Sequence, residues 1–200
     1  RRARLLRRAL GIAIAALAIA APRGARAGAL IGDVTTDRSA YAPGAPVTVH
    51  VALANQTGAP WTGALVLSFW HLGDPADAPA SQPVSLGAGQ AATVDFAWTP
   101  PAIDFRGYRV AVEARDAAQV VVDAAATAVD VSSDWKRFPR YGFLSRFDAG
   151  LDAAATIRAL ADFHLNGLQF YDWQWQHHRP YSPLAQWPDI ANRTIDAATV

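Results

Sequence analysis

The sequence has 200 residues and lacks cysteine and methionine entirely. Without cysteine, this stretch of the protein contains no disulfide, no thiolate zinc or iron–sulfur site and no cysteine nucleophile. Glutamate is almost absent as well, because 16 of the 17 acidic residues are aspartate and Glu113 is the exception. A reaction that depends on a glutamate therefore has one candidate in this chain.

Negative charge is missing from the first 27 residues, which contain seven arginines and no acidic residue. The remaining 11 basic residues face 17 acidic ones, so residues 28–200 carry a formal charge of about −6. A body of that sign repels phosphate backbones, and we expect no nucleic-acid partner. The hydrophobic share of 52% indicates a globular chain, and its length suits one or two domains.

The basic start is followed by a short apolar run, Ala9 to Ala21, of about 13 residues. Ala25-Arg26-Ala27 then supplies the small-x-small pattern that signal peptidase accepts. A transmembrane helix needs about 20 apolar residues, and this run is shorter. We therefore expect residues 1–27 to be a cleaved signal peptide. The protein would then be secreted, extracellular or periplasmic, without stable membrane insertion; a retained membrane anchor is the alternative.

Short apolar segments separated by turn-forming residues fill residues 28–131. These segments cover residues 47–53, 64–70, 92–98, 108–114 and 119–131. Most of them alternate apolar and other residues, which is typical of half-buried strands. About seven short strands in about 100 residues predict an immunoglobulin-like β-sandwich. Four aromatic residues are the expected core members, namely Trp61, Trp70, Trp98 and Tyr108.

The pattern changes after Asp134. Tyr141 to Leu144 is a short apolar run, and Leu151 to Phe163 shows apolar residues at helical spacing, with Asp148 or Asp152 as the N-cap. Asn166-Gly167 predicts a left-handed helix stop, and a second strand, residues 168–171, follows it. Strand, helix and strand form a βαβ unit with parallel strands. A polar-aromatic loop then covers residues 175–195, and a further helix is expected to open at Ile195.

The segment from Tyr171 to Tyr181 is the densest aromatic and hydrogen-bonding stretch of the chain. Loops at the carboxyl ends of parallel strands carry ligand sites. Aromatic faces suit sugar rings, and polar side chains bond to hydroxyl groups, so the segment favours a carbohydrate ligand. The candidate substrate-binding residues are Tyr171, Asp172, Trp173, Gln174, His177 and His178. The alternative is a loop that packs its aromatic residues on one another.

The adjacent residues His177 and His178 raise the possibility of a metal site. Neighbouring residues rarely aim at one ion, and no third ligand is evident in the sequence. We therefore expect no metal and no cofactor.

Two strings carry a resemblance to a known family, Asp134 to Leu144 (DWKRFPRYGFL) and Phe163 to Gln174 (FHLNGLQFYDWQ). They resemble glycoside hydrolase family 66, which contains endo-dextranases and cycloisomaltooligosaccharide glucanotransferases. The strings His177 to Pro180 and Trp187 to Arg193 look similar to it as well. The resemblance implies a multidomain protein, with an all-β immunoglobulin-like sandwich over residues 28–131. Residues 132–200 would be the first, incomplete βαβ portion of a catalytic (β/α)8 TIM barrel.

The resemblance also implies an enzyme that cleaves α-1,6-linked glucan such as dextran by a retaining mechanism, with a glucan polysaccharide or oligosaccharide as partner. Such enzymes use two carboxyl groups about 5 Å apart. In the family these are an Asp and a Glu beyond the equivalent of residue 200, so no catalytic residue is assigned and this chain alone is expected to be inactive. Asp172 would accept hydrogen bonds from glucose hydroxyls.

Three alternatives remain open from the sequence. One is a cycloisomaltooligosaccharide glucanotransferase, which passes the glycosyl group to a sugar hydroxyl instead of water. Another is a non-catalytic carbohydrate-binding surface protein that has lost the carboxylates. The last is a different exported polysaccharide hydrolase, because one fold hosts many chemistries.

Overall fold

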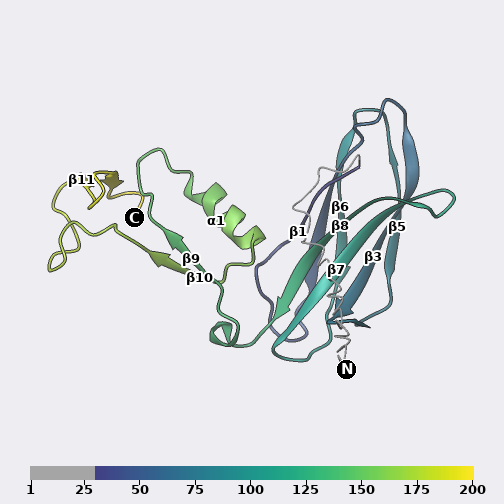
Figure 1. The fold of residues 1–200 in the computed structure, drawn as a ribbon, viewed down its shortest axis with the longest axis horizontal. Coiled ribbons are helices and arrows are strands. Elements are labelled where there is room, and N and C mark those ends of the chain that lie inside the picture. The colour runs from purple at the N-terminus through teal and green to yellow at the C-terminus, as the bar shows by residue number, and fades with distance from the viewer. Residues whose placement is uncertain (1–29) are drawn as a thin grey trace, which may run out of the picture.

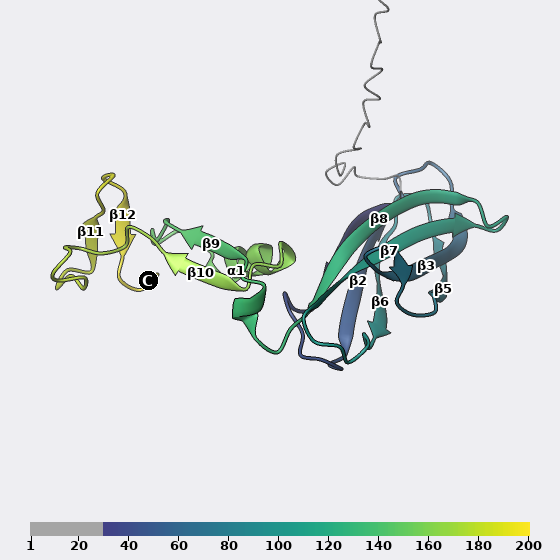
Figure 2. The ribbon, with the colours of Figure 1, turned by 60° about the horizontal axis from the view of Figure 1, so that its bottom comes forward.

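The computed structural model describes residues 30–200, so the predicted signal peptide, residues 1–27, lies outside the described residues. The described chain forms a β-rich region and a smaller C-terminal region that extends away from it (Figures 1 and 2). The boundary between them falls after residue 131, where the last long strand ends. That each region is an independent domain stays a prediction.

The first region contains eight strands. They are β1 (Ile31–Thr36), β2 (Val47–Ala54), β3 (Trp61–His71), β4 (Asp74–Pro75), β5 (Ala80–Leu86), β6 (Ala91–Trp98), β7 (Arg106–Asp116) and β8 (Val121–Val131). One sheet has the order β1-β2-β6, and the other has the order β4-β3-β7-β8 with β5 also paired to β3. All of these pairs are antiparallel. A sandwich-like β fold is consistent with this arrangement.

Alternate residues of the strands point into one shared core. Strand β2 buries Val47, Val49, Val51 and Leu53, and the residues between them are partly exposed. Strands β3 and β7 follow the same period of two, which is the period predicted from the sequence. The buried side chains of both sheets form a single cluster. Burial of an aliphatic side chain of this size contributes about 1.5–3 kcal/mol, so this region contains most of the hydrophobic stabilisation of the chain.

The four aromatic residues predicted for the core divide into two groups. Trp98 and Tyr108 are buried, with their rings 5.4 Å apart, and Trp61 packs against the cluster from its edge. Trp70 is only partly buried and lies outside the cluster, so its prediction was wrong. The reason is strand geometry, because Trp70 follows the buried Phe69 and successive side chains point to opposite faces.

The C-terminal region contains shorter elements. They are the 3-10 turn η1 (Trp135–Arg137), β9 (Tyr141–Leu144), α1 (Ala153–Asp162), β10 (Gly167–Phe170), β11 (Gln186–Pro188) and β12 (Thr194–Asp196). Strands β9 and β10 pair in parallel, and β11 and β12 pair antiparallel. Of the labelled elements, β11 lies farthest from the first region in both ribbon views (Figures 1 and 2).

The helix begins as predicted but ends differently. The Asp152 side chain accepts a hydrogen bond from the backbone N–H of Ala155 at 2.9 Å, which caps the first turn. The left-handed residue after α1 is His164, with φ of 56°, and not Asn166 or Gly167. Gly167 instead begins β10, where a Cβ atom would lie 3.0 Å from the Tyr141 ring. A larger residue there would require the Tyr141 ring to move by a few tenths of an ångström.

The predicted start of a (β/α)8 TIM barrel is wrong for the structure of residues 30–200. Strands β9 and β10 form a two-stranded sheet, and the next two strands pair with each other instead of extending it. The helix expected at Ile195 is replaced by β12, because Ile195 pairs with Trp187 of β11 and is fully buried. The described residues thus contain one βαβ unit followed by a hairpin, with no closed barrel.

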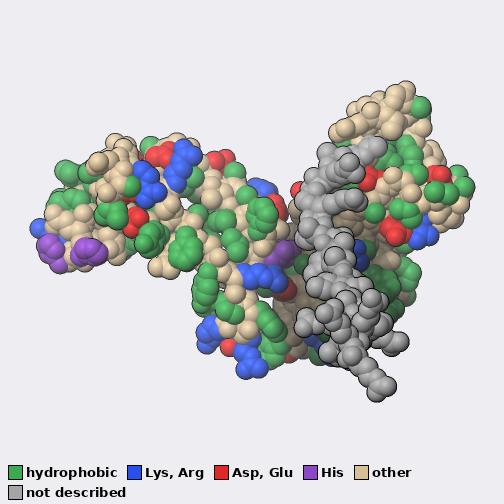
Figure 3. Space-filling model, viewed as in Figure 1, with side chains coloured by type: hydrophobic (Ala, Val, Ile, Leu, Met, Phe, Trp, Pro, Cys, Tyr) green, Lys and Arg blue, Asp and Glu red, His purple; other side chains and the backbone are tan. Residues whose placement is uncertain are grey.

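Helix α1 has no buried residue, and large apolar side chains are exposed around it on the C-terminal region (Figure 3). These exposed residues include Tyr141, Phe143, Ile157, Phe163 and Phe170. Within residues 30–200, no helix combines the length and hydrophobicity needed to cross a bilayer.

A charged and aromatic contact joins the two regions. The guanidinium of Arg140, just before β9, donates to both carboxylate oxygens of Asp130 in β8. The Arg137 guanidinium lies 4.6 Å from the centre of the Phe105 ring. Bidentate arginine–carboxylate pairs fix direction as well as distance. This contact therefore fixes the direction in which the backbone enters β9 after the sandwich.

Candidate functional site

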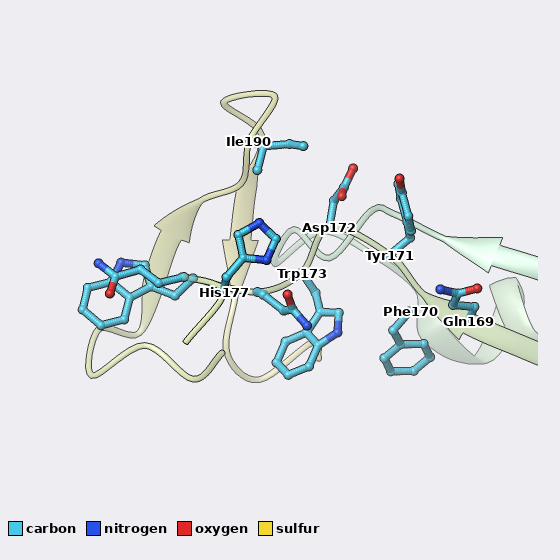
Figure 4. A pocket seen from close by; sticks show the side chains of 10 residues that line it. Gln169, Phe170, Tyr171, Asp172, Trp173, His177 and Ile190 are labelled. Atoms are coloured by element: carbon cyan, nitrogen blue, oxygen red, sulfur yellow. The ribbon is translucent and has the colours of Figure 1, made fainter. Parts of the chain in front are cut away.

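A pocket of about 360 Å³ opens where β10 ends (Figure 4), in the region that extends away from the sandwich (Figure 1). Its volume lies near the lower end of the range of about 300–1,000 Å³ for small-molecule sites. Five of the six residues predicted for substrate binding line it, and His178 does not. Those five are Tyr171, Asp172, Trp173, Gln174 and His177. The other lining residues are Gln169, Phe170, Trp175, Gln176 and Ile190.

The backbone changes direction at Asp172, which has a left-handed φ of 57°. Aspartate tolerates this conformation better than most residues, and such residues are frequent at functional sites. The turn interrupts the alternation of side chains that β10 establishes. Tyr171 and Asp172 therefore point to the same side of the chain, whereas Phe170 and Trp173 point to the other (Figure 4).

The Asp172 carboxylate is largely covered, with 22% of its side chain exposed. Its ionic partner is Arg193, whose Nη2 atom lies 3.7 Å from Oδ2. That distance is longer than a hydrogen bond, so the pairing leaves the lone pairs of the carboxylate available. Asp172 therefore has a nearby positive charge from Arg193, and its carboxylate can still accept hydrogen bonds on the wall of a pocket.

Arg193 lies in the turn between β11 and β12 and is held there by Asp189. The Nε atom of Arg193 donates to Asp189 Oδ2 at 2.5 Å, and Nη1 donates to Ser145 Oγ at 3.3 Å. The Asp189 side chain has no exposed surface. Burial acts to raise the pKa of Asp189, but hydrogen bonds from Arg193 and from the backbone of Ala191 outweigh it, so the pKa is lowered.

The contributions of Arg193 and Ile190 to the site were not predicted from the sequence. In the sequence, their turn belongs to the string Trp187 to Arg193, which carries a resemblance to a family. A usable signal was present, because Asp189 and Arg193 are oppositely charged and four residues apart. The spacing does not show where the pair lies, since that depends on the β11–β12 hairpin.

The tryptophans of the segment have a structural role as well as a place in the pocket wall. Trp173 and Trp175 pack on a small cluster of buried residues. The Trp187 indole Nε1, from that cluster, donates to the Trp173 carbonyl oxygen at 3.0 Å. The alternative of a loop that packs its own aromatic residues is thus realised for these two rings. Both tryptophans also line the pocket.

Tyr171 offers an accessible aromatic face. Half of the residue is exposed, and its ring packs edge-on against Phe143 of β9, with centroids 6.2 Å apart. An exposed ring held by a neighbour loses little entropy when it contacts a ligand.

The described residues hold no candidate metal cluster, and Glu113 lies outside the pocket lining. Residues 30–200 contain no group of three or more side chains able to hold a metal ion. Glu113 lies in β7 of the sandwich, where Arg115 donates two hydrogen bonds to its Oε2 atom. It is therefore remote from the pocket and already paired.

Comparison with known proteins decides the family. The model of Glycosyl hydrolase family 66 matches residues 36–200. This chain belongs to glycosyl hydrolase family 66. The resemblance seen in the sequence is therefore confirmed.

Three similar proteins refine the picture of this family 66 chain. Two are cycloisomaltooligosaccharide glucanotransferases from Niallia circulans, 40% and 35% identical over 179 residues each. The chain spans only 18% of the length of these relatives, while the match covers 85% of the chain. The third is a solved cycloisomaltooligosaccharide glucanotransferase from Paenibacillus sp., complexed with cycloisomaltoheptaose. It is 40% identical with a TM-score of 0.74, and the match covers 84% of this chain and 25% of that one.

Proposed function

We propose that the protein containing this family 66 chain is a secreted enzyme that acts on α-1,6-linked glucan, and that the pocket after β10 binds one glucose unit of it. The observation that carries the proposal is Asp172, a largely covered carboxylate with open acceptor capacity on a wall of aromatic and amide side chains. Sugars present this combination of hydroxyl donors and apolar ring faces. Family membership supports the same substrate class.

The pocket supplies binding groups of two kinds. Tyr171 presents an exposed ring for contact with a sugar face, and Asp172 accepts hydrogen bonds from hydroxyl groups. A hydrogen bond to a charged acceptor contributes about 1.5–3 kcal/mol. Gln174 and His177 add further hydrogen-bonding partners within the same pocket. A single glucose unit therefore has polar and apolar contacts on adjacent walls.

The reaction we propose is retaining cleavage, with a nucleophile and an acid/base about 5 Å apart. Asp172 is assigned neither role, because it has no carboxylate partner in the pocket lining. Glu113 is excluded by its place in the sandwich. In this proposal the described residues bind and orient the sugar and do not perform the chemistry.

A second candidate is cyclising transfer, in which the glycosyl group passes to a hydroxyl of the same glucan chain. It is supported by the names of the relatives, all three of which are cycloisomaltooligosaccharide glucanotransferases. Both candidates need the same glucose-binding pocket. The products distinguish them, since hydrolysis gives linear and transfer gives cyclic oligosaccharides.

The test uses the full-length protein with dextran as substrate and separates the products by size and cyclic form. Asp172→Asn preserves the left-handed turn and removes the charge, and we expect kcat/KM to fall about tenfold. Asp172→Ala removes the acceptor altogether and should lower kcat/KM by about 10- to 100-fold. Asp74→Asn, an exposed change on β4 of the sandwich, is the control and should have no effect.

Three results would contradict the proposal. If Asp172→Ala has the same kcat/KM as the wild type, this pocket is not the sugar site. Activity on starch or cellulose but not on dextran would show that α-1,6-linked glucan is not the substrate. Dextran binding without any product would favour the non-catalytic carbohydrate-binding protein.

A further inference from the structure

The Arg193 guanidinium joins three segments that are far apart in the sequence. Its Nη1 atom donates to Ser145, which directly follows β9, and its Nη2 atom faces Asp172, which follows β10. Its Nε atom donates to Asp189 in the β11–β12 turn. One planar group therefore connects the carboxyl ends of both parallel strands with the hairpin that brings Ile190 into the pocket.

Asp189 fixes the direction of this arginine. Its Oδ1 atom accepts hydrogen bonds from the backbone N–H groups of Ala191 and Arg193, both at 2.8 Å. Its own N–H donates to the Arg193 carbonyl oxygen at 2.9 Å, which closes the turn. A fully covered carboxylate with these partners holds one conformation, and the arginine fork adopts the matching one.

Asp172 is the one member of this group that lines the pocket. Its Oδ2 atom lies 3.7 Å from Arg193, close enough for electrostatic attraction and too far for a direct hydrogen bond. Asp189 holds the Arg193 guanidinium so that its positive charge has a fixed position beside Asp172, whereas a flexible lysine would carry the same charge without a fixed position. The orientation of Asp172 therefore depends on a side chain that itself lies outside the pocket lining.

We propose that Arg193, held by Asp189, is a positioning residue that orients the Asp172 carboxylate toward the sugar hydroxyls. The inference rests on the proposed glucose-binding function of the pocket. Arg193 does not contact the sugar in this arrangement. Its effect passes entirely through Asp172, so it disappears when Asp172 no longer carries its charge.

The test is a double-mutant cycle in the full-length protein, with linear isomaltooligosaccharide as substrate. Arg193→Lys keeps the positive charge and removes the fork, and we expect KM to rise about tenfold while kcat changes less than about twofold. In the Asp172→Asn background, Arg193→Lys should cause no further rise in KM. Arg146→Lys is the matched control, because Arg146 pairs with Asp148 on the surface of the same region.

Two measurements separate positioning from a structural role. The melting temperature of Arg193→Lys should fall, because Asp189 loses the Nε donor, and it should fall equally in the Asp172→Asn background, where KM no longer rises. An equal loss of kcat, or a KM increase that persists in the Asp172→Asn background, would overturn the positioning role. A wild-type KM in Arg193→Lys, together with a raised KM in Asp172→Asn, would also overturn the positioning role. The proposed sugar site would then remain supported. Normal KM in Asp172→Asn itself would instead overturn the proposed function.

Discussion

The region of β1 to β8 and the region of β9 to β12 bury their apolar residues to very different extents. The first packs 20 buried residues into one cluster, whereas the second has a cluster of only three, Phe147, Trp187 and Ile195. The helix of the second region buries none. The candidate site lies in the region with the smaller core, where polar contacts such as Arg193–Asp189 supply part of the order. The two regions should therefore respond differently to the same perturbation.

The largest expected difference is between the separated regions. Residues 28–131 alone should unfold in one cooperative transition, because the two sheets close a shared core. Residues 132–200 alone should show no cooperative transition, because so little apolar surface is buried. Calorimetry of the two fragments checks both statements. A sharp transition from the 132–200 fragment would show that its small cluster is sufficient.

Equivalent truncations in the two regions should also differ. Leu67 in β3 is fully buried, so Leu67→Ala should cost about 2–5 kcal/mol of unfolding free energy through lost contacts and a cavity. Ile157 in α1 is 48% exposed, and Ile157→Ala should cost less than about 1 kcal/mol. Urea unfolding of the two full-length variants gives the comparison. Equal costs would mean that α1 is covered in solution.

A buried tyrosine should give the sandwich a dependence on alkaline pH. Burial, followed by the hydrogen bond that the Tyr41 hydroxyl donates to Asp37, raises the pKa of Tyr41 to about 12. Above about pH 10 the unfolded chain releases this proton first, so stability is complete below that pH and falls as pH rises through the folded pKa. The loss approaches about 2–3 kcal/mol at about 1.4 kcal/mol per pKa unit.

The measurement compares urea unfolding of the wild type and Tyr41→Phe from about pH 9 to about pH 11.5. The wild type should lose more stability than the variant over this interval, because the variant has no proton to release at this position. Parallel curves would show that the Tyr41 hydroxyl is accessible to solvent.

Most of the sandwich could be predicted from the sequence because its strands are local patterns. Residues 47–53 alternate with a period of two, and the structure places a strand over Val47–Ala54. The helix start at Asp152 and most of the pocket residues after β10 were also predicted, since caps and strand ends have short-range signatures. The exception, Trp70, shows the limit of reasoning from residue type alone, because its position in β3 decides its face.

The parts that could not be predicted depend on contacts between distant residues. The antiparallel pairing of β11 with β12 replaced an expected helix because Ile195 meets Trp187 in a buried cluster. The left-handed turn at Asp172 and the approach of Arg193 also lie beyond local patterns. The ionic partner of Asp172 is 21 residues away in the sequence, and only the fold brings the two side chains together.

The most direct test of the account is the affinity of the full-length protein for cycloisomaltoheptaose, the ligand of the solved relative. Calorimetry should give a Kd that is about tenfold weaker for Asp172→Asn than for the wild type, and unchanged for the sandwich control Asp74→Asn. Melting temperatures of the three proteins should agree, because Asp172→Asn retains the left-handed turn. An equal Kd for the wild type and Asp172→Asn would contradict the assignment of the β10 pocket as the glucose site.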